Sequence, residues 1–170
     1  MSKKPQELDD NYKLALGELV IEASKLDSRV TELIAALTNT HIAHALITVH
    51  NAQFAQKLDM LRSLLRLAYP DDDDPNYAPI KEDLARIKEV AEFRNTVVHA
   101  LWQIDDAGVP HAVRFRARGQ LKRQRVPAPI EHIRQKTLET RDLVGTLGTL
   151  AQGYREWLKP DPQSESSDQR

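Results

Sequence analysis

The chain has 170 residues, 41% hydrophobic and 29% charged, which is enough apolar material for one compact core and excludes wholesale disorder. Its 24 basic and 25 acidic side chains nearly cancel, so any attraction to nucleic acid must be local. The lack of cysteine excludes disulfides and thiolate chemistry, and the lack of a signal peptide or a membrane-spanning apolar run predicts a soluble cytoplasmic protein.

Proline positions divide the chain into long windows with helical periodicity, because proline interrupts helices. In the first window, apolar residues recur at alternating steps of four and three, which predicts a long amphipathic helix with the seam Tyr12, Leu16, Leu19, Ala23, Leu26, Val30, Leu33 and Leu37. A short amphipathic helix is expected over His41–Thr48. A second long helix follows, with Phe54, Leu58, Leu61, Leu65 and Ala68 on one side.

The second half of the chain changes its periodicity once. A third long helix is expected from about Ile80 to Leu101, after the loop Pro70–Pro79. Apolar and basic residues then alternate within 102–126, which predicts a small hairpin or a three-stranded meander. A fourth long helix follows, and the tail 159–170 has a disordered composition. The predicted fold is therefore all-α: one antiparallel four-helix bundle over residues 1–158, with a β excursion between its third and fourth helices.

The third helix carries the most informative segment, EFRNTVVHALW, at 92–102. Arg94 falls near the middle of the apolar arc of this helix, and a buried guanidinium needs a partner: a buried carboxylate, a water-filled cleft or a phosphate. Asn95, His99 and Trp102 lie at i, i+4 and i+7 and share a stripe along one edge of the arc. Since an imidazole exchanges protons near neutral pH, Arg94, Asn95 and His99 are candidate catalytic residues.

The segment Arg94–His99 (RNTVVH) resembles the R-x4–6-H motif of the HEPN superfamily. This resemblance implies a dimeric helical bundle that acts, in many members, as a metal-independent endoribonuclease in toxin–antitoxin, abortive-infection or CRISPR-associated defence. It implies RNA, a second copy of the chain and an antitoxin protein as partners, with no metal or cofactor. At position 101 this chain has leucine where one subgroup has a tyrosine, which argues against regulation through that residue.

The chemistry that the resemblance implies follows known physical rules. The ribose 2′-OH attacks the phosphorus and leaves a 2′,3′-cyclic phosphate, with His99 as general base or acid. Arg94 grips the phosphate oxygens, and Asn95 orients the histidine or the phosphate. DNA lacks the 2′-OH and is expected to survive.

The predicted β excursion carries six cations within twelve residues, with no acid between them: Arg114, Arg116, Arg118, Lys122, Arg123 and Arg125. Along a strand the first three would share one face, and such a stripe can track an RNA backbone. A solvated hairpin face explains the same pattern equally well. The sequence shows no aromatic platform for RNA, because Phe115 is expected to point away from the three arginines.

Two other classes of function remain open. One is a non-catalytic helical module that binds a protein or a nucleotide through its heptad seams. The other is a structural protein in which Arg94 pairs with a buried acid. His41 and His44 lack the carboxylate pattern of a zinc motif and are expected on a helix surface, and the acidic run Asp71–Asp74 is expected to be a solvated linker.

Overall fold

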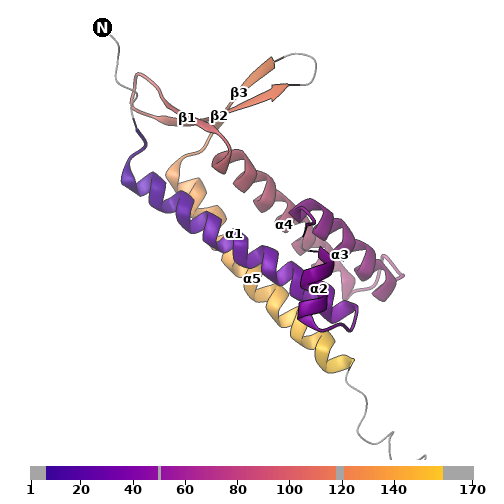
Figure 1. Cartoon of the computed structure of the whole chain (residues 1–170). Coiled ribbons are helices and arrows are strands. Elements are labelled where there is room, and N and C mark those ends of the chain that lie inside the picture. Colours follow the sequence, from indigo (N-terminus) through magenta and orange to yellow (C-terminus); the bar gives the residue numbers. More distant parts are fainter. Residues whose placement is uncertain (1–6, 50, 118–120, 159–170) are drawn as a thin grey trace, which may run out of the picture. The chain divides into compact units, whose positions relative to one another are not determined.

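A computed structural model describes residues 7–49, 51–117 and 121–158 of the chain (Figure 1). These residues form five helices and one small sheet: α1 (Asp10–Leu37), α2 (Ile42–Val49), α3 (Phe54–Ala68), α4 (Tyr77–Val98), β1 (Leu101–Ile104), β2 (Pro110–Ala117), β3 (Leu121–Pro127) and α5 (Ile130–Trp157). The predicted helical character and the predicted meander are both confirmed. The expectation of an all-α fold is too narrow, because the three strands form a complete antiparallel sheet.

The chain divides into two compact units, each built from two separate segments. Unit 1 comprises Met1–Leu26 and Lys81–Val144, and unit 2 comprises Asp27–Ile80 and Gly145–Arg170. The single domain expected over residues 1–158 stays a prediction, and the tail 159–170 lies outside the described residues. Among the described residues, no helix is both long enough and apolar enough to cross a membrane.

The core of unit 1 joins α1, α4, the sheet and α5 through one apolar cluster of buried residues: Tyr12, Ala15, Leu19, Val97, Ala112, Ala128 and Ile133. Trp102 of β1 packs against this cluster. Its ring meets the ring of Tyr12 edge-on with the centroids 5.9 Å apart, and its Nε1 donates a hydrogen bond to the backbone oxygen of Val97 at 3.0 Å. Trp102 therefore ties the first strand to the last turn of α4.

Helix α4 is displaced by three residues at each end from the predicted Ile80–Leu101. It begins early because Pro79 lies in the first helical turn, where its missing N–H breaks no helical hydrogen bond. It ends early because Leu101 and Trp102 pair with Val113 and Ala112 of β2. The backbone N–H of His99 still bonds to the oxygen of Asn95 at 3.4 Å, so the helical path continues to the histidine.

The register of the sheet decides which hairpin side chains share a face. The strand order is β1-β2-β3, and both pairings are antiparallel, beyond the C-terminal end of α4 (Figure 1). Phe115 lies opposite Arg123, and Arg114 lies opposite Gln124. Directly opposed residues point to the same side of an antiparallel pair, and successive residues alternate. Since Ala112 is fully buried in the core, Arg114 lies on the inner face and Phe115 on the outer one.

Asp105 closes the loop between β1 and β2. Its Oδ1 accepts hydrogen bonds from the backbone N–H groups of Ala107 at 3.0 Å and Val109 at 2.8 Å, and its Oδ2 lies 2.8 Å from Nε2 of His111. The bond with His111, together with these backbone donors, lowers the pKa of Asp105. The ionised carboxylate therefore holds the loop that presents β2.

Replacement of Asp105 by asparagine is expected to destabilise the protein in a pH-dependent way. A lowered pKa in the folded state means that the carboxylate contributes stability above its unfolded pKa of about 4. This contribution is lost as the pH falls through the lowered pKa. The Tm difference between wild type and Asp105→Asn should therefore be full at about pH 6 and shrink steadily below about pH 4. A difference that stays constant over this range would contradict the assignment.

Unit 2 contains an ion pair between α1 and α3. The Nζ of Lys57 bonds to both carboxylate oxygens of Asp27, at 2.9 and 2.8 Å. The side chain of Lys57 is 11% exposed, and that of Asp27 is 40% exposed. Water can therefore still stabilise the carboxylate of Asp27, whereas the charge of the Lys57 ammonium is stabilised mainly by Asp27.

The variant Asp27→Asn is expected to lower the free energy of unfolding by about 1–2 kcal/mol, because it leaves a mostly buried ammonium without its counterion. Lys57→Met is the matched control, since it removes the buried charge and keeps a long apolar side chain. It should cost clearly less. Urea denaturation of the two variants measures the difference, and equal losses would show that desolvation of Lys57 is not the dominant effect.

Candidate functional site

Arg94 lies at the surface of α4 and bonds to a neutral group. Its Nη1 donates a hydrogen bond to Oδ1 of Asn95 at 3.0 Å, and the residue is half-buried. Within the described part of the chain, no carboxylate lies within ion-pair distance of this guanidinium. The buried acid that a purely structural role would need is therefore not found among these residues, and the cation keeps the capacity to bind an anion.

Arg94 escapes the core because it lies at the edge of the buried face of α4, which widens on the far side near the end of the helix. Ile87 and Val90, on the arc that includes Arg94, are fully buried. In the last two turns, Val97 continues the direction of Val90, and Thr96, about 200° from Arg94, is buried as well. Here the helix packs against the sheet, so the buried side follows the sheet and Arg94 is left at the edge.

Asn95 and His99 extend the polar surface next to Arg94. Both are exposed and lie one helical turn apart. At about 100° per residue, the direction of His99 differs by about 40° from that of Asn95 and by about 140° from that of Arg94. The hydrogen bond to Asn95 draws the guanidinium of Arg94 toward the side on which His99 lies. In the described part of the chain, the imidazole of His99 has no hydrogen-bond partner.

The sheet brings a second guanidinium to the same helix end. Nη1 of Arg114 donates a hydrogen bond to Oγ1 of Thr96 at 2.9 Å, and this hydroxyl donates to the backbone oxygen of Glu92 at 2.8 Å. Thr96 is only 8% exposed, so both bonds fix its hydroxyl in place. Arg114 is half-buried and, like Arg94, has no acidic partner among the described residues.

We call Arg94, Asn95, His99 and Arg114 the α4-end cluster. The sequence pattern predicted the first three as one group and placed Arg114 in a separate basic stripe. In the structure, Arg114 instead donates a hydrogen bond to Thr96, the residue between Asn95 and Val97. Thr96 is the positioning residue that sequence analysis missed, and its only signal was a hydroxyl inside the motif.

The other basic residues of the hairpin do not all share one face of the sheet. Arg123 and Arg125 lie opposite Phe115 and Val113, so they share the outer face and not the face of Arg114. Arg123 also donates a hydrogen bond to Oε1 of Gln103 on β1. The backbones of Arg116 and Lys122 pair across the hairpin, but their side chains lie outside the described part of the structure, as does all of Arg118. The common face expected for Arg114, Arg116 and Arg118 stays a prediction.

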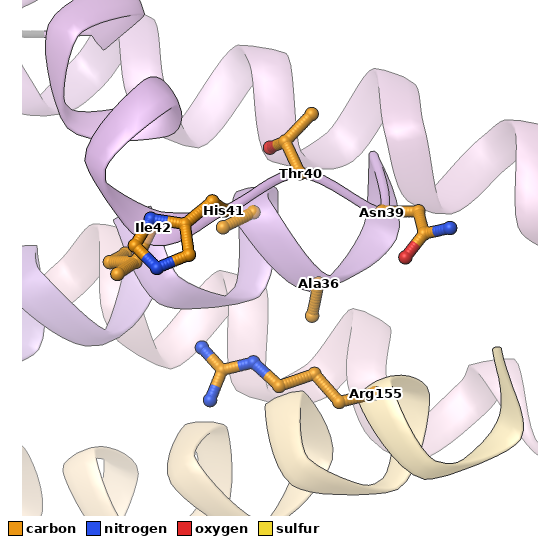
Figure 2. Close-up of a pocket in the computed structure, with 7 residues that line it drawn as sticks. Ala36, Asn39, Thr40, His41, Ile42 and Arg155 are labelled. Carbon is orange, nitrogen blue, oxygen red and sulfur yellow. The ribbon is translucent and has the colours of Figure 1, made fainter. Parts of the chain in front are cut away.

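Unit 2 contains a hollow of about 340 Å³ at the turn between α1 and α2 (Figure 2). Arg155 extends across it toward His41 and Ala36. Ala36 belongs to the last turn of α1, where the helix dipole favours a cation. Nδ1 of His41 accepts a hydrogen bond from the backbone N–H of Ala43 at 3.2 Å, at the start of α2. Local structure therefore accounts for both polar groups, and no residue of the α4-end cluster lines this hollow.

Histidines and acids do not gather into a metal site in the described ranges. No group of three or more His, Asp or Glu side chains there is arranged to hold an ion. His41 and His44 are both exposed, as expected, and their rings meet edge to face with centroids 6.3 Å apart. The α4-end cluster is therefore the candidate functional site.

Comparison of the chain with models of known protein families, with curated proteins and with solved structures gave no significant match. The functional hypothesis therefore depends on the α4-end cluster and on the resemblance of its sequence to the R-x4–6-H motif.

Proposed function

We propose that the chain is a metal-independent endoribonuclease with a HEPN-like four-helix bundle that pairs as a dimer. In this proposal it belongs to a toxin–antitoxin or phage-defence system and is held in check by an antitoxin protein. The observation that supports it most is the α4-end cluster: two guanidiniums and an imidazole at one helix end, with no acidic partner among the described residues. Donors without acidic partners at one end of a helix suit the phosphates of a nucleic-acid strand.

The proposed reaction assigns one task to each side chain. The 2′-oxygen of the RNA bonds to phosphorus while the bond to the 5′-oxygen of the next nucleotide breaks. His99 takes the proton from the 2′-OH, and the imidazole of a second copy of the chain returns a proton to the leaving oxygen. Arg94, held by Asn95, donates to the non-bridging oxygens as negative charge builds on them. Arg114, held by Thr96 about 200° around α4 from Arg94, binds a neighbouring phosphate of the same strand.

The nature of the nucleophile gives a direct test of this function. The purified protein, in the presence of EDTA, is incubated with a single-stranded RNA and with a DNA of the same sequence. We expect the RNA to be cut and the DNA to remain intact, since DNA has no 2′-OH. Cleavage of the DNA at a similar rate, or complete survival of the RNA, would overturn the proposal.

Arg114→Gln is expected to weaken RNA binding by about tenfold at low salt, because it removes one charge-assisted contact. The slope of log affinity against log salt should become shallower by about 0.7, the value for one phosphate contact on a single strand. Arg134→Gln is the matched control, since Arg134 is an exposed arginine on α5 in the same unit. Salt titration of labelled RNA measures both variants, and equal effects would remove Arg114 from the site.

A non-catalytic dimeric module is the alternative function, and one observation favours it. Leu14 and Ile21, two turns apart on α1, are 61% and 57% exposed. Both lie on one side of the helix, and a second helix could cover them in a dimer. This alternative predicts a stable dimer or a protein complex without RNA cleavage. Sedimentation analysis together with the RNA and DNA assay separates the two functions.

A further inference from the structure

The outer face of the hairpin presents an aromatic ring on β2 beside two arginines on β3. Phe115 is the sixth of the eight residues of β2 and is 50% exposed. Arg123 of β3 lies directly opposite it, and Arg125 lies opposite Val113, two residues earlier on β2. Arg123 and Arg125 are both exposed. The alternation of the strands puts all three on one side, which we call the outer face: Phe115, Arg123 and Arg125.

The exposure of Phe115 differs from that of its nearest apolar neighbour on the same side. Val113 is 1% exposed, so the outer face can bury an apolar side chain at that position. Phe115 remains half-exposed, although burying an aromatic ring is worth about 1.5–3 kcal/mol. A ring left accessible beside two cations is a surface that a flat, apolar, negatively charged ligand can cover.

The charged side chains of the sheet are all basic. None of the residues in β1, β2 and β3 is acidic. Arg125 has no hydrogen-bond or ion-pair partner among the described residues, and the neutral Gln103 holds Arg123. The complement of this face is therefore a polyanion rather than a mixed protein surface.

We propose that the outer face binds single-stranded RNA by stacking an unpaired base on Phe115, while Arg123 and Arg125 contact the flanking phosphates. Arg123 and Arg125 are two residues apart, about 7 Å along the strand, so both can reach the backbone of one nucleotide segment. A base in a duplex has its faces covered by its neighbours, so this mode selects unpaired strands. The inference rests on the proposed function only in naming RNA as the ligand, because stacking requires no cleavage.

Binding is best measured by fluorescence anisotropy in a His99→Ala background, in which the proposed function predicts that RNA cleavage is too slow to disturb the measurement. The probes are a labelled single-stranded RNA, a single-stranded DNA of the same sequence, the RNA duplex and an abasic strand. Phe115→Ser and Phe115→Leu should each weaken binding of both single strands about tenfold. Phe115→Tyr keeps the ring and should bind as the parent does. Leucine is the matched control for size and apolarity, since it lacks only the π-face.

The abasic strand and the duplex should bind weakly and should not respond to any change at Phe115. Unchanged single-strand affinity in Phe115→Ser, or equal affinity of the leucine and phenylalanine proteins, would overturn the inference. Binding of the DNA strand tests the stacking inference independently of the proposed nuclease activity, because the bases of DNA can stack but its sugars have no 2′-OH. Loss of DNA binding in both Phe115→Ser and Phe115→Leu supports stacking even if the wild type cuts no RNA. Thermal denaturation of each variant verifies that it is folded.

Discussion

The His99→Ala variant is expected to lose RNA cleavage by about a thousandfold, the middle of the range for removal of a general acid or base. The imidazole of His99 is exposed at the end of α4 with no partner among the described residues, so its replacement should leave the fold intact. Single-turnover cleavage of a labelled RNA measures the loss. His44→Ala, which removes another exposed histidine, should cut as fast as wild type.

Arg94→Ala should lose cleavage by about a hundredfold or more, because its guanidinium stabilises the charge that develops on the phosphate. Arg94→Lys should recover only part of the rate, since an ammonium lacks the paired donors of the guanidinium. Asn95→Ala should have a smaller effect, of about tenfold, because it removes only the group that holds Arg94. If these variants and His99→Ala all cut as fast as wild type, the α4-end cluster is not an active site.

The Trp102→Ala variant is expected to lower the free energy of unfolding by about 3 kcal/mol, the largest stability loss that we predict for the sheet. The substitution removes the edge-on contact with Tyr12 and the hydrogen bond to the backbone oxygen of Val97. Both contacts fix β1, and through it β2 and Arg114, at the end of α4. Urea denaturation measures the stability, and cleavage should fall in parallel at temperatures where wild type is fully folded.

Trp102→Phe separates the two contributions. It keeps most of the packing against Tyr12 and loses the hydrogen bond, which should cost about 1 kcal/mol. Equal losses for the alanine and phenylalanine variants would show that packing of this ring contributes little to the attachment of the sheet.

The helices could be predicted because their signals are local. The four-three spacing of apolar residues on α1 is confirmed at Tyr12, Leu19, Leu26, Val30 and Leu33, all of which are buried. The ends of α4 could not be placed correctly by the same rule. The expected loop includes Pro79, although the first turn of a helix accepts proline. Leu101 continues the apolar pattern of the helix, although it pairs with Val113 in the sheet. Periodicity alone cannot distinguish these cases, because the deciding contacts lie elsewhere in the chain.

Part of the candidate site could likewise be predicted from local spacing, and part depends on contacts between distant residues. Arg94, Asn95 and His99 are close in sequence, so helical geometry was enough to group them. The contact between Arg114 and Thr96 spans 18 residues and exists only because of the register of the meander. The pairing of Phe115 with Arg123 depends on the length of the β2–β3 connection, which no residue pattern specified. The basic residues could therefore be recognised from the sequence, but not which of them contacts the helix and which lie beside an aromatic ring.

The account as a whole is tested most directly by expressing the wild-type chain beside His99→Ala in the same cells and mapping the ends of their RNA. We predict growth arrest and new RNA fragments that end in 2′,3′-cyclic phosphates in the wild type, and neither effect in the variant. Identical growth and identical RNA ends in the two strains, at equal levels of folded protein, would contradict it.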